Sequence, residues 1–155
     1  MNHVNRGKQF ESCVREGLQK IQNTTVTRLI DPQNGYSGVR NPCDFIVYHY
    51  PAQYFIECKS CYGNTLSFSN ITDFQWQRLV EVSACVGVSA GVLIWFMDHD
   101  KTIWVPIQYL EAIKKYGAKS IHVAKIDYNV CLEIPGEKKR ILFDYDFSPL
   151  LCGRI

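Results

Sequence analysis

The stretch that decides the fold is Asp44-Phe45-Ile46-Val47-Tyr48-His49-Tyr50-Pro51-Ala52-Gln53-Tyr54-Phe55-Ile56-Glu57-Cys58-Lys59. Two apolar runs flank a turn around Pro51, and this order predicts a β-hairpin. Folding about the turn brings Asp44 opposite Glu57. Because side chains alternate along a strand, Glu57 and Lys59 share one face while Cys58 points the other way. The hairpin therefore predicts two carboxylates and an ammonium that converge on one point.

This combination of side chains suits a metal-dependent phosphodiesterase. Mg²⁺ takes oxygen ligands and keeps several waters, so one or two carboxylates and a substrate phosphate can hold it. Such a metal polarises a phosphoryl oxygen and lowers the pKa of water. Lys59 could orient or deprotonate the attacking water, or stabilise charge on the phosphate oxygens. The alternative interpretation is an Asp at a strand start and an exposed Glu/Lys pair on a solvated edge.

Two helical segments supply further polar groups. Residues 7–22 predict an amphipathic helix, and its buried stripe consists of Phe10, Cys13, Val14, Leu18 and Ile21. Glu11 borders that stripe and can reach the sheet. Residues 72–86 predict a second helix with Thr72 as its N-cap and Gln75 in the first turn, facing the same pocket. Taken alone, Glu11 and Gln75 would be ordinary helix-surface residues.

With these residues the sequence resembles the RecU-type Holliday-junction resolvases of the PD-(D/E)xK nuclease superfamily. The motifs that carry the resemblance are N-R-G-x-x-F-E at residues 5–11, the acids Asp44 and Glu57 with Lys59 at the family's spacing, and Gln75. Residues 119–121 and 126–128 resemble the family's C-terminal segment. The resemblance implies an α/β, restriction-endonuclease-like core with a mixed central β-sheet flanked by helices. It also implies a homodimer that nicks two opposed strands of a four-way DNA junction with Mg²⁺ or Mn²⁺.

The resemblance assigns roles residue by residue. Asp44 and Glu57 are expected to bind the metal, with the main-chain carbonyl of Cys58 as a further oxygen and Glu11 as an outer or second-metal ligand. Lys59 is expected to assist the attacking water, and Gln75 to position water or phosphate. DNA contacts are expected from Arg6, Lys8, Arg40, Ser60 and Arg78.

One segment departs from the family's pattern. Those resolvases carry a long, basic stalk between the first helix and the first catalytic acid. Here residues 24–41 are few, hold only Arg28 and Arg40 as cations, and contain a turn region from Gly35 to Gly38. The sequence therefore predicts a compact, phage-like relative with a short stalk.

Length and charge are consistent with this interpretation. The chain of 155 residues, 46% of them hydrophobic, predicts a single nuclease domain over residues 1–155. With a net charge of +2 the protein is only mildly basic, so any DNA-binding surface must be local. Basic groups gather at Arg6 and Lys8, at residues 114–119 and at residues 138–140. Binding through such groups should be sensitive to salt, although each cluster could equally be a solvated face.

Other classes of protein find less support. No apolar stretch is long enough to span a membrane, and no signal peptide opens the chain. Seven irregularly spaced cysteines suggest reduced thiols and a cytoplasmic protein. No P-loop or dinucleotide motif is present, so no nucleotide cofactor is expected.

The remaining elements complete an α/β order. We expect a loop at residues 62–70, strands at residues 91–97 and 102–107, a short helix at residues 108–115, and a hairpin of residues 130–134 with 141–145 around Pro135-Gly136.

Two motifs suggest other chemistry. Residues 87–91 match the G-x-S-x-G nucleophile elbow, but that motif needs a strand before it and a helix after it, and the order expected here is the reverse. The pair Cys58 and Cys61 forms a lone C-x-x-C, and no second close pair completes a zinc site. The pair overlaps the end of a predicted strand, whereas a redox pair would open a helix. Neither motif is expected to be functional.

The sequence thus predicts a metal-dependent endodeoxyribonuclease that resolves four-way junctions in recombination and repair. A restriction- or repair-type nuclease with the same site is the alternative enzyme. A non-catalytic DNA-binding module of the same fold is the alternative from another class. The intact Asp44, Glu57 and Lys59 argue against that module, because a purely binding protein has no physical need for acids that face phosphate.

Overall fold

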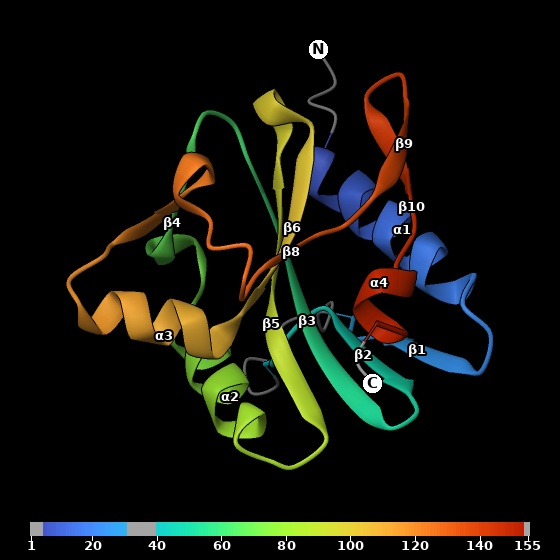
Figure 1. Ribbon diagram of the computed structural model, residues 1–155, viewed down its shortest axis with the longest axis horizontal. Coiled ribbons are helices and arrows are strands. Elements are labelled where there is room, and N and C mark those ends of the chain that lie inside the picture. Colours follow the sequence, from blue (N-terminus) through green and yellow to red (C-terminus); the bar gives the residue numbers. More distant parts are fainter. Residues whose placement is uncertain (1–4, 31–39, 154–155) are drawn as a thin grey trace.

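The protein is built on one mixed β-sheet. The computed structural model describes residues 5–30 and 40–153. Its main sheet has six strands in the order β1-β2-β3-β5-β6-β8 (Figure 1). These strands are β1 (Thr24–Arg28), β2 (Phe45–His49), β3 (Ala52–Cys61), β5 (Val88–Phe96), β6 (Lys101–Pro106) and β8 (Leu132–Glu133). Only β3 and β5 pair in parallel, and every other neighbouring pair of these described strands is antiparallel.

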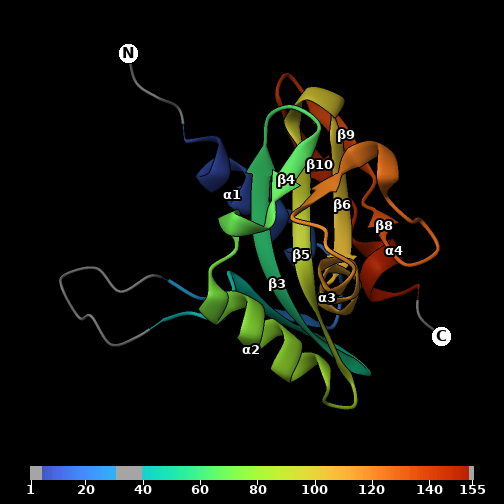
Figure 2. The same cartoon turned by 90° about the vertical axis from the view of Figure 1, so that its left-hand side faces the viewer.

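Helices cover both faces of this sheet, as Figures 1 and 2 show. One face carries α1 (Arg6–Gln19), the hairpin of β9 (Gly136–Lys139) and β10 (Leu142–Tyr145), and the short α4 (Ser148–Leu151). The other face carries α2 (Asp73–Ser83) and α3 (Ile107–Lys115), with a small sheet of β4 (Thr65–Ser67) and β7 (Ser120–His122). The described residues also contain three single-turn 3-10 helices: η1 (Phe68–Asn70) between β4 and α2, η2 (Met97–His99) between β5 and β6, and η3 (Val123–Lys125) between β7 and β8. The predicted α/β class, a mixed central sheet flanked by helices, is confirmed.

The β2–β3 hairpin has the predicted register. Phe45 pairs with Ile56 and Val47 with Tyr54, so the next position along the strands sets Asp44 beside Glu57. The main-chain N–H of Asp44 donates to the Ile56 carbonyl at 3.1 Å, which extends the pairing by one residue. Buried side chains of β2 and β3 pack against α1, while Phe55 packs toward α2 and α3. The apolar alternation of the hairpin therefore fixes which face each acid occupies.

Helix α1 begins where a cap is available. The side chain of Asn5 accepts a hydrogen bond from the N–H of Lys8, which satisfies one of the helix's free donors. Of the predicted stripe, Phe10, Val14 and Leu18 are fully buried. The helix ends at Gln19 rather than at residue 22, so the last stripe position packs on the core from beyond the helix end.

The second helix ends earlier than predicted, and the strand after it begins earlier than predicted. Helix α2 ends at Ser83 instead of residue 86, and β5 begins at Val88 instead of residue 91. Gly87 provides the change of direction with a φ of +82°, a conformation that favours glycine. The extra strand residues 88–90 pair with residues 53–55 of β3, so tertiary pairing sets the boundary.

The chain after residue 129 corrects the predicted tail hairpin. Leu132 and Glu133 form β8 and pair with β6, whereas the hairpin is made by β9 and β10. Its turn lies at Arg140, which adopts a left-handed φ of +57°, and not at Pro135-Gly136. The prediction of a loop at residues 62–70 is also corrected, because these residues contain the strand β4 and the 3-10 helix η1.

The segment predicted as a short stalk is described only in part. Its first residues form β1 at the edge of the main sheet, antiparallel to β2. Residues 31–39, including the predicted turn region from Gly35 to Gly38, lie outside the described residues. Within the described ranges, no helix combines the length and the apolar character needed to cross a membrane.

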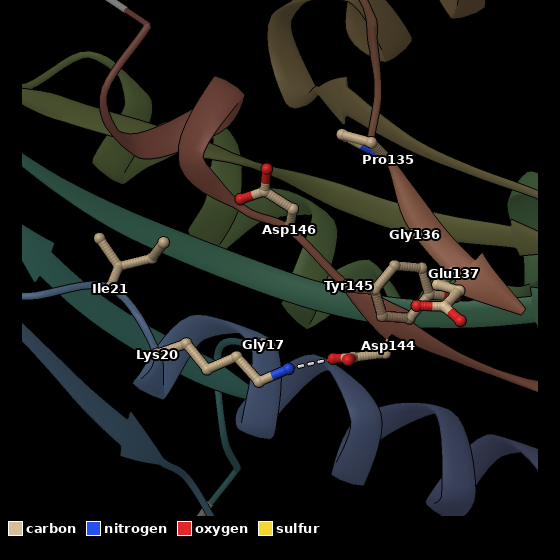
Figure 3. A pocket seen from close by; sticks show the side chains of 9 residues that line it. All are labelled: Gly17, Lys20, Ile21, Pro135, Gly136, Glu137, Asp144, Tyr145 and Asp146. Carbon is tan, nitrogen blue, oxygen red and sulfur yellow. Dashed lines mark hydrogen bonds and ion pairs between the residues drawn. The ribbon is translucent and has the colours of Figure 1, made fainter. Parts of the chain in front are cut away.

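The β9–β10 hairpin leaves a cavity of about 630 Å³ against the end of α1. Figure 3 shows its lining, in which Lys20, just after α1, faces Asp144 of β10. Asp146 and Glu137 also line this cavity, which makes it a second place in the molecule where acids gather. It lies on the α1 face of the sheet, away from α2.

Candidate active site

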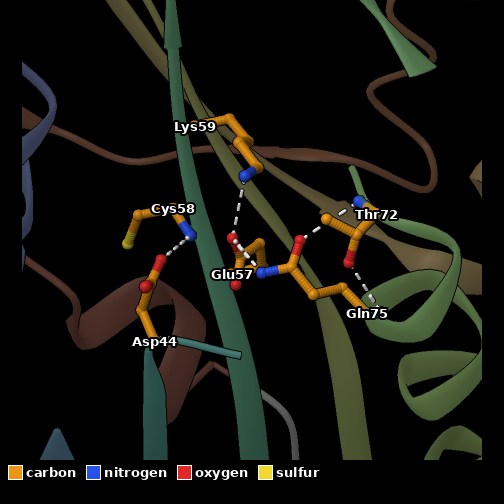
Figure 4. Close-up of polar contacts among 6 residues, drawn as sticks. All are labelled: Asp44, Glu57, Cys58, Lys59, Thr72 and Gln75. Carbon is orange, nitrogen blue, oxygen red and sulfur yellow. Dashed lines mark hydrogen bonds and ion pairs between the residues drawn. The ribbon is translucent and has the colours of Figure 1, made fainter. Parts of the chain in front are cut away.

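The first acid of the candidate site is held by the end of the hairpin. Asp44 immediately precedes β2, and its Oδ2 accepts a hydrogen bond of 2.8 Å from the main-chain N–H of Cys58 (Figure 4). This bond ties the carboxylate to the strand that carries Glu57. The predicted convergence of Asp44 with the Glu57-Cys58-Lys59 segment is therefore present.

The second acid, Glu57, is buried, with only 2% of its surface exposed. Its Oε1 accepts hydrogen bonds from Lys59 Nζ at 3.0 Å and from Gln75 Nε2 at 3.0 Å. Its Oε2 is buried and has no hydrogen-bond partner among the described residues. A buried carboxylate oxygen without a donor is costly, because the lost hydration is not replaced.

This environment changes the acidity of Glu57. Burial, followed by the nearby charge of Asp44, raises the pKa of Glu57 to about 7, although Lys59 opposes the shift. The same two carboxylates, after burial, raise the pKa of the Cys43 thiol to about 12. The site is therefore short of positive charge, and a cation placed beside Glu57 would relieve it.

Gln75 is oriented by the start of α2. The hydroxyl of Thr72 accepts from the N–H of Gln75 at 3.1 Å, and Oε1 of Gln75 accepts from the N–H of Thr72 at 3.2 Å. This reciprocal capping box leaves the amide Nε2 of Gln75 to donate to Glu57. Thr72 is the predicted N-cap, and Gln75 faces the acids as predicted, with the hydrogen bond visible in Figure 4.

Lys59 lies on the same face of β3 as Glu57, as predicted from alternation. Its side chain is 22% exposed while that of Glu57 is 3% exposed, so the ammonium lies at the mouth of the site. Cys58 points to the opposite face and packs in the core beside α1. A cation at the solvent edge of a buried acid can meet a phosphate that approaches from outside.

Glu11 approaches from the other face of the sheet. It lies on α1 and forms an ion pair with Arg28 of β1, and the side chains of the two are about one-fifth and one-third exposed. Its charge is the smallest of the causes that raise the pKa of Glu57, and it also raises the pKa of Cys58. Glu11 is thus within electrostatic range of the acids. The Arg28 partner was missed, because no local sequence pattern links a helix residue to a strand residue that follows it by seventeen positions.

The predicted DNA-binding residues lie in different surroundings. Arg40 stacks over the Phe74 ring of α2, 5.5 Å from its centroid, and Arg78 pairs with Glu81 on the same helix. Arg6 donates to Gln9 on α1, and Lys8 is exposed near the start of that helix. Ser60 follows Lys59 on β3, so strand alternation turns its side chain toward the face of Cys58.

The residues present fit a divalent cation that takes oxygen ligands. Two carboxylates meet here, and one of their oxygens is buried and unsatisfied. Among the described residues, no group of three or more His, Cys, Asp or Glu side chains forms a ready metal cage. That is compatible with Mg²⁺, which is usually held by one or two carboxylates, waters and substrate phosphate.

Neither of the two alternative motifs has the geometry that its chemistry requires. Ser89 of the G-x-S-x-G motif lies within β5, paired with Tyr54 of β3, and not on a turn between a strand and a helix. Cys58 and Cys61 both lie in β3, and all seven cysteines are free thiols. The serine-hydrolase and C-x-x-C interpretations are therefore excluded on geometry.

The chain matches one protein family over most of its length. The family model of RecU, described as recombination protein U, matches residues 18–145. The chain belongs to the RecU family. RecU proteins are Holliday-junction resolvases, so the chain is a nuclease of DNA recombination, and nucleases of this kind use divalent metal ions. The matched residues include Asp44, Glu57, Lys59 and Gln75, and they begin after Glu11.

Solved structures add one named similarity. No curated protein matches the chain. Among the 18 matching chains of known structure is Archaeoglobus fulgidus Hjc, a Holliday-junction resolvase from an archaeal hyperthermophile. It is 19% identical with a TM-score of 0.49, and the match covers 66% of this chain and 78% of Hjc. Membership of the RecU family rests on the sequence match over residues 18–145.

Proposed function

We propose that this RecU protein, as one nuclease domain over residues 1–155, resolves four-way DNA junctions with Mg²⁺ or Mn²⁺ bound at Asp44 and Glu57. One observation carries the proposal: within the described part of the chain, Oε2 of Glu57 is buried without a partner beside a second carboxylate, and the pKa of Glu57 is raised to about 7. Nothing in the folding of a hairpin requires this arrangement. A bound cation would satisfy the oxygen and favour the ionised form of both acids.

The main-chain carbonyl of Cys58 is proposed as the third oxygen ligand. Its N–H is directed at Asp44, and the N–H and carbonyl of a strand residue lie on the same side of the strand. The carbonyl is therefore also directed toward the Asp44 edge of β3. Glu11 is proposed as an outer ligand, or as the ligand of a second ion, because its charge already acts on Glu57 and Cys58.

The polar groups around the acids divide the remaining work. A bound divalent ion supplies charge for the phosphoryl oxygen and lowers the pKa of water. Lys59, at the mouth of the site, orients the attacking water or stabilises the charge that develops on the phosphate. Gln75 donates from a side chain that the capping box holds in place, so it can position water or phosphate without reorganisation.

Recognition of the junction is proposed to involve a homodimer. Two nicks on opposed strands need two active sites, and a twofold dimer presents them with the symmetry of the junction. Arg6, Lys8, Arg40, Ser60 and Arg78 remain proposed DNA contacts. We also propose that the protein acts in the cytoplasm and needs no nucleotide cofactor.

A gel assay tests the function directly. Four-way, forked and linear duplexes of equal arm sequence are incubated with the wild-type protein in Mg²⁺, in Mn²⁺ and in EDTA. The proposal expects paired nicks in the four-way junction that depend on the metal, with less cutting of the other two substrates. Equal cutting of linear duplex by a particle that light scattering shows to be monomeric would favour a general nuclease instead. Cutting that persists in EDTA would contradict the proposed dependence of cleavage on a divalent metal ion.

A further inference from the structure

A cleft of about 600 Å³ lies next to the first turn of α2. Its floor contains the buried side chains of Phe68 and Ile71. The rest of the lining is polar or small and comes from η1 with the residue before it, the start of α2, and the end of α3 with the residues after it: Ser67, Ser69, Thr72, Asp73, Lys114, Ala118 and Lys119. The cleft thus combines an apolar floor with a polar wall, and it reaches the helix start at which Gln75 is held.

Two lysine side chains, those of Lys114 and Lys119, line the cleft. Neither lysine forms an ion pair with any described residue. Lys114 Nζ lies over the ring of Trp76, 4.3 Å from the centroid, and the indole N–H of Trp76 donates to Glu111. Because Trp76 is only 6% exposed, it provides a fixed platform for the Lys114 side chain.

Hydroxyl groups line the same cleft. The hydroxyls of Ser67 and Ser69 share a hydrogen bond of 2.8 Å, and that of Thr72 caps α2. The start of an eleven-residue helix adds a partial positive charge to this side. Asp73 is the one carboxylate among the described residues of the lining, so two cations face one anion. Cations and hydroxyls together suit a phosphodiester oxygen, which accepts hydrogen bonds and carries negative charge.

The cleft is connected to the candidate active site by two hydrogen bonds. The N–H of Thr72 donates to Gln75 at 3.2 Å, and Gln75 donates to Glu57 at 3.0 Å. A DNA strand whose scissile phosphate lies at Glu57 and Lys59 therefore passes close to the cleft if it runs along the start of α2.

We infer that this cleft binds a backbone phosphate that flanks the scissile phosphate, through Lys114 and Lys119. The inference rests on the proposed cleavage site at Asp44 and Glu57. The cleft would fix the position of the strand relative to the acids without reading its sequence. Both lysines belong to the basic cluster at residues 114–119, although neither is among the DNA contacts that the family resemblance assigns.

The neighbouring residue on α3 offers a matched control. Lys115 is exposed like Lys114 but lines a different groove, formed with Val80, Gln108, Glu111, Ala112 and Tyr116. The substitutions Lys114→Gln, Lys119→Gln and Lys115→Gln each remove one charge and keep most of the side chain. The three variants therefore differ in where the charge is removed and not in how much.

The first measurement is the salt dependence of junction binding in EDTA, where no cleavage occurs. The double variant Lys114→Gln/Lys119→Gln should bind more weakly, with a slope of log K against log salt lower than wild type by about 1 for each phosphate that is no longer neutralised. Lys115→Gln should keep the wild-type slope. Equal slopes in the double variant and in Lys115→Gln would overturn the inference.

The second measurement identifies the phosphate. Junctions that carry one neutral methylphosphonate linkage at successive positions around the cleavage point are bound to wild type and to the double variant. Wild type should bind more weakly when the linkage lies at one or two flanking positions, and the double variant should show no further weakening there, because its lysines are already absent. If the neutral linkage weakens the binding of both proteins equally, the cleft does not bind the flanking phosphate, and the proposed cleavage site is unaffected. A wild-type protein that neither binds nor cuts a junction would instead overturn the proposed function and the cleft with it.

Discussion

Two groups of acids in this molecule differ in their surroundings. Asp44 and Glu57 lie at the hairpin of β2 and β3, and burial beside another acid raises the pKa of Glu57 to about 7. Asp144 and Asp146 lie in the cavity against α1 (Figure 3). A hydrogen bond from Lys20 lowers the pKa of Asp144, and hydrogen bonds from Ser148 lower the pKa of Asp146.

The difference separates a candidate metal site with an unsatisfied oxygen from acids that are already satisfied. The acids of the α1 cavity are exposed and already compensated, so a cation there would have to displace Lys20 or compete with water. At Glu57 an oxygen is buried and has no partner in the described part of the chain, so a cation would supply what the protein does not provide. The cavity's volume of about 630 Å³ says nothing about this distinction. Unsatisfied charge identifies the candidate site better than hollow space does.

The largest contrast should appear in cleavage. Asp44→Asn or Glu57→Gln should reduce the single-turnover rate on a four-way junction at least about a thousandfold, because several kcal/mol of metal assistance is removed. Junction binding should persist or tighten, since a charge that repels phosphate is removed. Asp144→Asn, in the α1 cavity, serves as the control and should cleave like wild type. Near-normal cleavage by Asp44→Asn or Glu57→Gln in Mg²⁺ would place the metal elsewhere.

The two lysine–carboxylate pairs, Lys59 with Glu57 and Lys20 with Asp144, should also differ in their effect on cleavage. Lys59→Ala should slow cleavage about a hundredfold or more, the scale of one preorganised transition-state interaction. Because Lys59 lowers the pKa of Glu57, the rate and the Mn²⁺ affinity should both be measured well above the pKa of about 7, where Glu57 is ionised with or without it. The affinity should then change little. Lys20→Ala, which breaks the pair with Asp144, should leave the rate unchanged. A variant of Lys59 that fails only through weaker metal binding would contradict its assigned role.

Stability should respond in opposite directions at the two acid groups. The pKa of Glu57 is raised from 4.5 to about 7, so the folded state favours the protonated acid, and ionisation between these values costs stability. Without metal, Glu57→Gln should therefore stabilise the fold by about 3 kcal/mol near pH ~8, and this gain should vanish in acid, below the ordinary pKa of 4.5. Asp144 has a lowered pKa, so Asp144→Asn should destabilise at neutral pH and become neutral in acid. Urea unfolding across this pH range measures both, and a Glu57→Gln protein less stable than wild type in mild alkali would contradict the unsatisfied charge.

The smallest effect concerns the amide that faces Glu57. Gln75→Ala should slow cleavage about tenfold, the lower end of the effect of removing a hydrogen bond to a charged group. It should also lower the melting temperature, because the capping box is broken. Gln77→Ala, on the exposed side of α2, controls for a glutamine-to-alanine change in the same helix. Equal cleavage rates for the two variants would show that Gln75 acts only as part of the helix cap.

The elements that sequence reasoning predicted correctly are those whose signals are local. The hairpin register of Asp44 and Glu57 follows from a turn and an alternation within one short stretch, and the amphipathic stripe of α1 is equally local. The capping box at Thr72 and Gln75 lies within a single helical turn. Each of these needed no knowledge of the rest of the chain.

The features that could not be predicted depend on distant partners. Strand β8 spans only Leu132–Glu133 and exists because β6 pairs with it. The turn of the tail hairpin was predicted at the wrong place, because Pro135-Gly136 has the composition of a turn, whereas the left-handed residue of the observed turn is Arg140. That Glu57 is 2% exposed depends on how α2 packs across the sheet. Sequence identified the acids, and only the packing shows that one of them is left unsatisfied.

The most direct test of that claim is calorimetric titration of Mn²⁺ into the metal-free protein at several pH values. If Glu57 must lose its proton to bind metal, the affinity should rise about tenfold per pH unit below about pH 7 and level off above it, with about one proton released at the acidic end. Asp144→Asn should follow the same curve, whereas Glu57→Gln should bind weakly and without this pH dependence. Tight binding that is independent of pH, or that survives in Glu57→Gln, would contradict the account.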